Sequence, residues 1–181
     1  AVHVVAPAAP GWPPRDAFGD VTVERVRYAP RALETLAYTG AMADALRSPT
    51  GLAALGGLLA STALAVRRAA RTHRADVVHA HWWFPGALAT LAPGVLGARP
   101  LVVTSHGSDV RLAAGVRPAR ALFARVLARA SAYTAVSSWL CAEARAMAPG
   151  HACEVAPMPV EAGRFAPPRD DAARDGLLFV G

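Results

Sequence analysis

The residues best suited to chemistry follow an apolar run at positions 100–103, which predicts a buried strand. Immediately after it, the imidazole of His106 can donate or accept a hydrogen bond, and Gly107 lets the backbone approach a ligand closely. Asp109 has two equally favoured interpretations: it caps the helical segment that follows, or it binds a ligand hydroxyl. Open α/β sheets bind ligands at the carboxyl ends of their strands, so we predict a site here. Its candidate residues are His106, Gly107, Ser108 and Asp109.

A second cluster follows the strand predicted at positions 76–80. We expect His79 and His81 to point to opposite faces of the sheet, which argues against a shared metal ion, and no third ligand stands at zinc-like spacing. Trp82 and Trp83 are interpreted either as core residues or as rim residues, because an indole can stack on the apolar face of a sugar ring. We take His81, Trp82 and Trp83 as candidate substrate-binding residues and predict no metal site.

A third polar strand exit is the pair Ser137 and Ser138, which follows the strand predicted at 132–136. The favoured role of the pair is to cap the next helix, although Glu143 is too far along to complete a capping box. The alternative is an anion held at the exposed amino terminus of that helix, and we retain Ser137 as a candidate binding residue. Neither serine lies in a G-x-S-x-G elbow, so a hydrolase triad has no support.

The segments that position these residues alternate between strand and helix patterns. From residue 76 onward, apolar runs typical of buried strands are separated by segments with a helical spacing of apolar residues. Strands are predicted at 76–80, 101–104, 132–136 and 153–156, and helices at 86–96, 118–130 and 138–147. This order predicts parallel βαβ units and therefore an α/β fold with a doubly wound, Rossmann-like parallel sheet.

The first 75 residues are less regular. Strands are predicted at 2–6 and 21–28, with a proline- and glycine-rich loop at 7–20, and a helix is predicted at 31–47. The apolar run 51–66 precedes four arginines and is shorter than the roughly 20 residues of a transmembrane helix. We favour a helix packed on the sheet with its basic end in solvent. The alternative is a helix that lies on an anionic membrane surface.

Composition and charge narrow the class of protein. The chain has 181 residues, 54% of them hydrophobic, which is enough for one substantial core. Its net charge of +6 comes almost entirely from arginine and favours anionic partners. Nucleic acid is the weakest of these partners, because no nucleic-acid-binding motif accompanies the charge. Cys141 and Cys153 form neither a CxxC pair nor a disulfide framework, so we expect reduced thiols in an intracellular protein.

Both ends of the sequence indicate a piece of a longer protein. There is no initiator methionine and the first strand begins at Val2, while 177–181 is typical of a new strand that stops before its loop. A linker rich in proline, glycine and charge precedes that strand at 166–176. No signal peptide opens the sequence, and we expect a cytoplasmic protein.

Four segments of the chain, in order and spacing, resemble the amino-terminal domain of family 4 glycosyltransferases. They are DVVHAHW at 76–82, PLVVTSHGSD at 100–109, AYTAVS at 132–137 and VAPMPVEAGRFAP at 155–167. The run LFVG at 178–181 is similar to the first strand of that family's carboxyl-terminal domain. Each segment alone has modest specificity, but four in sequence are a fairly specific signal.

The resemblance implies a GT-B fold, in which two Rossmann-like domains face a cleft. The acceptor binds mainly on the amino-terminal side and the nucleotide-sugar on the carboxyl-terminal side. It implies a retaining transferase that needs no bound metal ion and no cofactor besides its nucleotide-sugar co-substrate, with a glycan, lipid or small molecule as acceptor. By its match to the family's strand-exit histidine, His106 is implied at the donor sugar and the reacting centre.

The resemblance also implies domain boundaries. Residues 1–165 correspond to the amino-terminal domain without its first strand and glycine-rich loop, 166–176 to the interdomain linker, and 177–181 to the first strand of the second domain. Met158 and Pro159 stand where the family often has asparagine and glycine. Because most of the donor site would lie outside this chain, we expect the isolated chain to have little transferase activity.

Two other functions remain open. One is a non-catalytic module on the same fold that binds an acceptor or a membrane lipid, with a peripheral position at the inner face of the membrane. The other is a different Rossmann-like enzyme, but the sequence has no G-x-G-x-x-G motif with a downstream acid.

Overall fold

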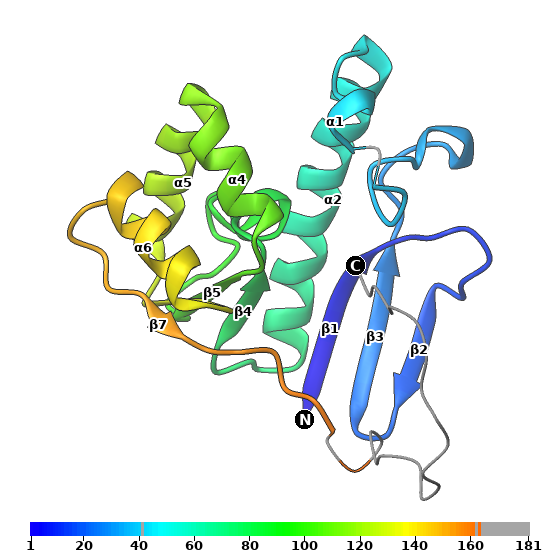
Figure 1. Cartoon of the computed structure of the whole chain (residues 1–181). Helices are drawn as coiled ribbons and strands as arrows, with labels where there is room; N and C mark the ends of the chain where they lie inside the picture. Colours follow the sequence, from blue (N-terminus) through cyan, green and yellow to red (C-terminus); the bar gives the residue numbers. More distant parts are fainter. Residues whose placement is uncertain (41, 162, 164–181) are drawn as a thin grey trace, which may run out of the picture.

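The computed structural model describes residues 1–40, 42–161 and 163 and shows an α/β fold with two β-sheets (Figure 1). In the larger sheet, all neighbouring strands are parallel. Its order is β4 (Val78–His81), β5 (Leu101–Ser105), β6 (Ala132–Ala135) and β7 (Glu154–Val155). The predicted Rossmann-like α/β class is confirmed.

The smaller sheet holds the first three strands of the chain. Its order is β1 (Val2–Pro7), β3 (Val21–Val26) and β2 (Arg15–Phe18). β1 and β3 run parallel, whereas β2 pairs antiparallel with β3 across a tight turn at Gly19. The prediction of an uninterrupted loop at 7–20 was therefore wrong. A four-residue strand bounded by prolines and glycine is too short for its alternation to be recognised.

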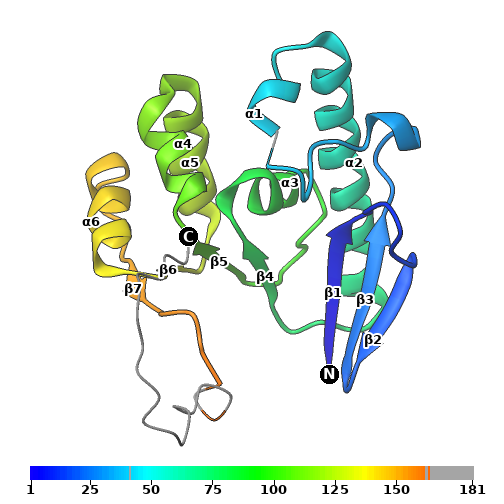
Figure 2. The ribbon, with the colours of Figure 1, turned by 45° about the vertical axis from the view of Figure 1, so that its right-hand side comes forward.

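The helical elements lie in the connections between strands. In chain order they are η1 (Arg31–Leu33), α1 (Met42–Ala45), α2 (Pro49–Thr72), the irregular turn η2 (Trp83–Ala87), α3 (Leu88–Thr90), α4 (Ser108–Gly115), α5 (Arg117–Arg129) and α6 (Ser138–Met147). From β4 onward strands and helices alternate as predicted, with α4 and α5 between β5 and β6 and α6 between β6 and β7. Figure 2 shows α6 and β2 at opposite ends of the molecule.

Two predicted helices were wrong because the backbone breaks inside them. Within 31–47 only η1 and α1 form, and Tyr38 between them has a positive φ of 66° that no helix allows. Within 86–96 only α3 is helical. After it, Gly94 has a positive φ of 72°, which a right-handed helix does not allow. Apolar spacing alone did not reveal either break.

Helix α2 is longer than the apolar run that predicts it, at 24 residues. The Ser48 hydroxyl caps its first turn by accepting a hydrogen bond from the Gly51 N–H at 3.0 Å. Gly57 lets the helix approach the backbone of Tyr28 closely, because a Cβ at position 57 would lie 2.1 Å from the carbonyl oxygen of Tyr28. α2 packs on β1 and β3, as favoured from the sequence. By length and composition alone the same helix would be able to cross a membrane.

The main hydrophobic core is formed by residues of the parallel sheet and of the helices α4, α5 and α6 that pack on it. Phe123 of α5 is fully buried, with edge-on contacts to Trp83 at 5.8 Å and to Tyr133 at 5.9 Å between ring centroids. Val103 of β5 and Val126 of α5 are equally buried within the same cluster. Such packing fixes the positions of the strand ends to which the polar residues are attached.

A disulfide bond joins Cys141 of α6 to Cys153, just before β7. The two Cα atoms lie 5.4 Å apart and both residues are buried. The expectation of reduced thiols was therefore wrong. A separation of 12 residues gives no sign of pairing in the sequence, because the contact exists only once α6 folds back beside β7.

Candidate functional site

The carboxyl ends of β4, β5 and β6 meet at one edge of the parallel sheet. His81 at the end of β4 pairs with Thr104, and Ser105 at the end of β5 pairs with Ala135. The loops that leave β5 and β6 therefore lie side by side, as the parallel topology predicts.

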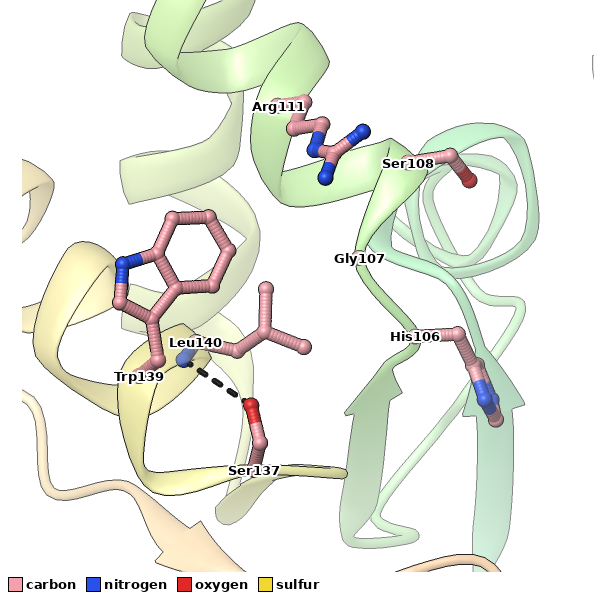
Figure 3. A pocket seen from close by; sticks show the side chains of 7 residues that line it. All are labelled: His106, Gly107, Ser108, Arg111, Ser137, Trp139 and Leu140. Atoms are coloured by element: carbon pink, nitrogen blue, oxygen red, sulfur yellow. Dashed lines mark hydrogen bonds between the residues drawn. The ribbon is translucent and has the colours of Figure 1, made fainter. Parts of the chain in front are cut away.

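An open cavity of about 480 Å³ lies between these two loops (Figure 3). Its lining residues are His106, Gly107, Ser108, Arg111, Ser137, Trp139 and Leu140. The sequence predicts four of them as site residues, namely His106, Gly107, Ser108 and Ser137. The remaining predicted residues, His81, Trp82, Trp83 and Asp109, do not line this cavity.

Asp109 holds the loop that carries His106. Its Oδ1 accepts hydrogen bonds from the backbone N–H groups of His106 at 3.1 Å and Gly107 at 3.0 Å, and its Oδ2 accepts one from the N–H of Trp83 at 3.2 Å. Asp109 is only 4% exposed. The capping interpretation was therefore wrong: Asp109 lies within the first turn of α4, whose amino-terminal cap residue is Gly107 and which no side chain caps. Both carboxyl oxygens instead accept hydrogen bonds from backbone N–H groups of the preceding loops.

The backbone conformation at position 107 of the same loop favours glycine over any other residue. Its φ of 123° and ψ of −56° belong to a region that side chains with a Cβ rarely adopt. A Cβ would meet only ordinary contacts, the nearest being Leu140 at 3.9 Å. The constraint is therefore conformational, and this turn places the His106 peptide against the cavity.

The two tryptophans have separate roles. Trp83 is 1% exposed, and its indole Nε1–H donates to the carbonyl oxygen of Asp109 at 2.6 Å, so it belongs to the core. Its assignment as a substrate-binding residue is corrected, because no ligand can reach a ring at that depth. Trp82 is 43% exposed and lies edge-on to His106, with ring centroids 6.3 Å apart.

Three histidines gather at the rim beside the cavity. The rings of His79 and His81 lie 4.5 Å apart between centroids, and a 2.8 Å hydrogen bond joins His81 Nδ1 to His106 Nε2. His79 Nε2 also forms a 2.8 Å hydrogen bond with the hydroxyl of Thr104. The expectation that His79 and His81 point to opposite faces was wrong, because alternate residues of a strand share one face.

Two of the three histidines, His79 and His81, favour the uncharged form. Although His79 and His81 are exposed at the rim, partial desolvation of their rings lowers the pKa of both. For His79 the second cause of the lowered pKa is the charge of His106, and for His81 the charges of His79 and His106 add to desolvation. A neutral ring keeps one nitrogen as an acceptor, and the hydrogen bond between His81 and His106 needs one such nitrogen.

Ser137 is the amino-terminal cap of α6, as favoured from the sequence. Its hydroxyl accepts a hydrogen bond from the Leu140 N–H at 3.3 Å, drawn as a dashed line in Figure 3. The cap places the first turn of α6, with Trp139, at the cavity wall. Trp139 and Arg111 were not predicted. The signal that would have found them is their place in the first turn of a helix that begins directly after a strand exit.

Among the described residues, no three His, Cys, Asp or Glu side chains are grouped so that they could hold a metal ion. The rings of His81 and His106 are joined by a hydrogen bond and by stacking, and the ring of His79 makes a tilted contact with His81.

Most of the chain matches a known protein family. The profile of Glycosyltransferase Family 4 covers residues 1–164. The chain belongs to glycosyltransferase family 4. A comparison with curated proteins finds no match. Membership supports glycosyl transfer as the general function, with a sugar donor and an acceptor as substrates.

The family match confirms the resemblance seen in the sequence. It ends where the described part of this family 4 domain ends, near residue 163. The linker predicted at 166–176 and the strand predicted at 177–181 lie outside the described residues.

Proposed function

We propose that this family 4 domain forms the acceptor side of a retaining glycosyltransferase with a GT-B fold, and that His106 lies at the reacting centre. The observation that carries the proposal is the double support of His106. Its backbone N–H is bound by Asp109, and its ring is bound by His81. A polar group that is fixed before the substrate arrives costs no reorganisation during the reaction.

The reaction defines what such a group would do. The bond between the anomeric carbon and the donor's phosphate oxygen breaks, and that oxygen leaves with the bonding electron pair as part of the nucleoside diphosphate. The acceptor oxygen bonds to the anomeric carbon, and its proton passes to the leaving phosphate oxygen or to water. Positive charge grows on the sugar and negative charge on the leaving diphosphate. In this proposal a hydrogen bond from the His106 ring to the reacting sugar or its leaving group lowers the barrier. The nucleotide-sugar is a co-substrate, and no resident cofactor or metal takes part.

The other candidate residues would orient the substrates. Ser108 and Ser137 present hydroxyl groups at the cavity, and Gly107 brings the backbone close to it. Exposed Trp82 offers a stacking surface on the far side of His106, and His81 holds the His106 ring. The donor nucleotide would bind mainly to a second domain, so in this proposal the 181-residue chain alone turns over little substrate.

The test measures nucleoside diphosphate release by the complete natural gene product that contains this chain, with UDP-glucose, UDP-N-acetylglucosamine and GDP-mannose as donors. His106→Ala is expected to lower turnover by about 100-fold or more while the far-UV circular dichroism stays unchanged. Ser131→Ala, on the opposite edge of the sheet at the start of β6, is the matched control. Turnover by His106→Ala within twofold of wild type would remove His106 from the reacting centre.

A second candidate function, membrane contact, is favoured by the exposed face of α2. Leu52 and Leu64 are 55% and 63% exposed, and the small residues Gly56 and Ala60 lie between them on the same face. The exposed Arg67 continues this face at its basic end. We infer that the face rests on an anionic membrane surface.

Vesicle sedimentation tests this second function. The chain should pellet with phosphatidylcholine vesicles that contain phosphatidylglycerol and stay in solution with phosphatidylcholine alone. The double variant Arg67→Glu and Arg71→Glu should lose the binding. Arg125→Glu with Arg129→Glu on α5 makes the same change of charge elsewhere and should keep it. Equal loss in both variants would show a nonspecific charge effect and contradict a role for α2.

A further inference from the structure

Two side chains on the cavity wall have no role in the proposed reaction. Trp139 stands on the first turn of α6 and is 55% exposed, and Arg111 stands on the first turn of α4. In Figure 3 the indole and the guanidinium line the same cavity from two different elements. Neither is needed to hold the fold together, because each projects beyond the core that contains Phe123 and Trp83.

Trp139 presents a large apolar surface to the cavity. An indole that stays exposed gives up the stabilisation that burial of so large a side chain normally provides. Indole rings stack readily on the apolar C–H face of a sugar ring or on another planar ring. The cavity volume of about 480 Å³ lies within the range of small-molecule sites. The wall at Trp139 is therefore suited to a ring-shaped ligand.

Arg111 makes the same cavity a site for an anion. Within the described part of the chain, no ion pair or side-chain hydrogen bond engages its guanidinium, which presents five donors suited to phosphate oxygens. No acidic side chain lines the cavity. The nearest carboxyl along the chain, Asp109, is buried with both oxygens bound to backbone N–H groups. A negatively charged ligand group bound at Arg111 would therefore not be repelled by a carboxylate in the cavity wall.

We propose that this cavity binds a sugar ring that carries a phosphate, with Trp139 stacked on the ring and Arg111 bound to the phosphate. The inference rests on the proposed function and deepens it, because it makes the acceptor of the transfer a sugar phosphate. The same chemistry occurs in the sugar and phosphate of a donor nucleotide-sugar. The experiment separates the two sources by comparing a sugar phosphate with a nucleoside diphosphate.

Binding to the 181-residue chain is measured by ¹H–¹⁵N correlation spectra, without any need for turnover. The probes are glucose 6-phosphate, glucose, inorganic phosphate and UDP. Glucose 6-phosphate should shift the indole N–H resonance of Trp139, which is assigned from Trp139→Phe, and should bind at least about tenfold more tightly than glucose or phosphate. Trp139→Ala and Arg111→Gln should each weaken its binding by about tenfold.

Matched controls sit outside the cavity. Trp12→Ala removes another exposed indole, and Arg117→Gln removes another exposed arginine, so both should keep wild-type binding. The proposal is overturned by equal binding of phosphate and glucose 6-phosphate, by unchanged affinity in both cavity variants, or by UDP binding more tightly than glucose 6-phosphate. Retained glucose 6-phosphate binding together with an inactive complete enzyme would instead remove the proposed transferase reaction and leave this site standing.

Discussion

Replacing Asp109 should strongly lower the folding stability of this protein. Its carboxyl group accepts three backbone hydrogen bonds, from the N–H groups of His106, Gly107 and Trp83. Removing the acceptors leaves the buried Trp83 N–H without a partner, at a cost of about 2 kcal/mol, and the two half-buried loop N–H groups at about 1 kcal/mol each. Asp109→Ala should therefore lower the free energy of unfolding by about 4 kcal/mol. Asp109→Asn keeps one acceptor oxygen and should cost about half as much.

Urea unfolding followed by far-UV circular dichroism measures these changes. The matched control is Asp44→Ala on α1, whose carboxyl group is 81% exposed and forms an ion pair with Arg47 at 3.8 Å. This control should change stability by less than about 0.5 kcal/mol. In Asp109→Asn, which should still fold, the backbone N–H resonances of His106 and Gly107 should shift. A loss below about 1 kcal/mol for Asp109→Ala would refute the argument, because it would mean that the three donors find other partners.

Three further predictions concern stability. Replacing Cys141 and Cys153 together by alanine should lower the free energy of unfolding by about 3 kcal/mol, which is the loop-closure entropy expected for a separation of 12 residues. The double variant should also abolish any effect of a reducing agent on stability. An unchanged urea midpoint would contradict the disulfide bond. Phe123→Ala should cost about 3–5 kcal/mol in the same assay, because it empties the centre of the core, and a loss under 2 kcal/mol would show that the core collapses around the gap. Because the folded state lowers the pKa values of His79 and His81, the unfolded chain binds protons more tightly, so the melting temperature should fall as the pH drops below about 6.5. The double variant His79→Gln and His81→Gln should show a shallower fall, and an equal slope would exclude these rings as its cause.

The carboxyl edge of the parallel sheet could be predicted because its determinants are local. Apolar runs of four or five residues, separated by helical spacing, predict the strands at 76–80, 101–104 and 132–136. Once the strands are parallel, the residues that follow them must meet at one edge. The convergence of His106 and Ser137 thus follows from topology, without any side-chain detail.

Other features depend on contacts that no local pattern encodes. The disulfide between Cys141 and Cys153 requires α6 to lie beside β7, and β2 is specified by its pairing with β3. Trp82 and Trp83 are adjacent and identical in type, yet one is at the rim and the other in the core, because the backbone turns sharply at Trp82 with a φ of 66°. The contact between the rings of His79 and His81 follows from strand geometry, because residues two apart in a strand share one face. The expectation of opposite faces contradicted this period of two.

The position of His106 is determined more by the core than by its own loop. Phe123 packs on Trp83, Trp83 is bound through two N–H groups to Asp109, and Asp109 holds the peptide of His106, whose ring is bound to His81. Errors of about 1 Å at a reacting group cost large factors in rate, so a core that fixes this chain of contacts is part of the catalytic apparatus in the proposed function. The two side chains of the cavity wall stand outside that chain of contacts. Substrate choice can therefore change at the wall by single substitutions while the reacting histidine stays in place.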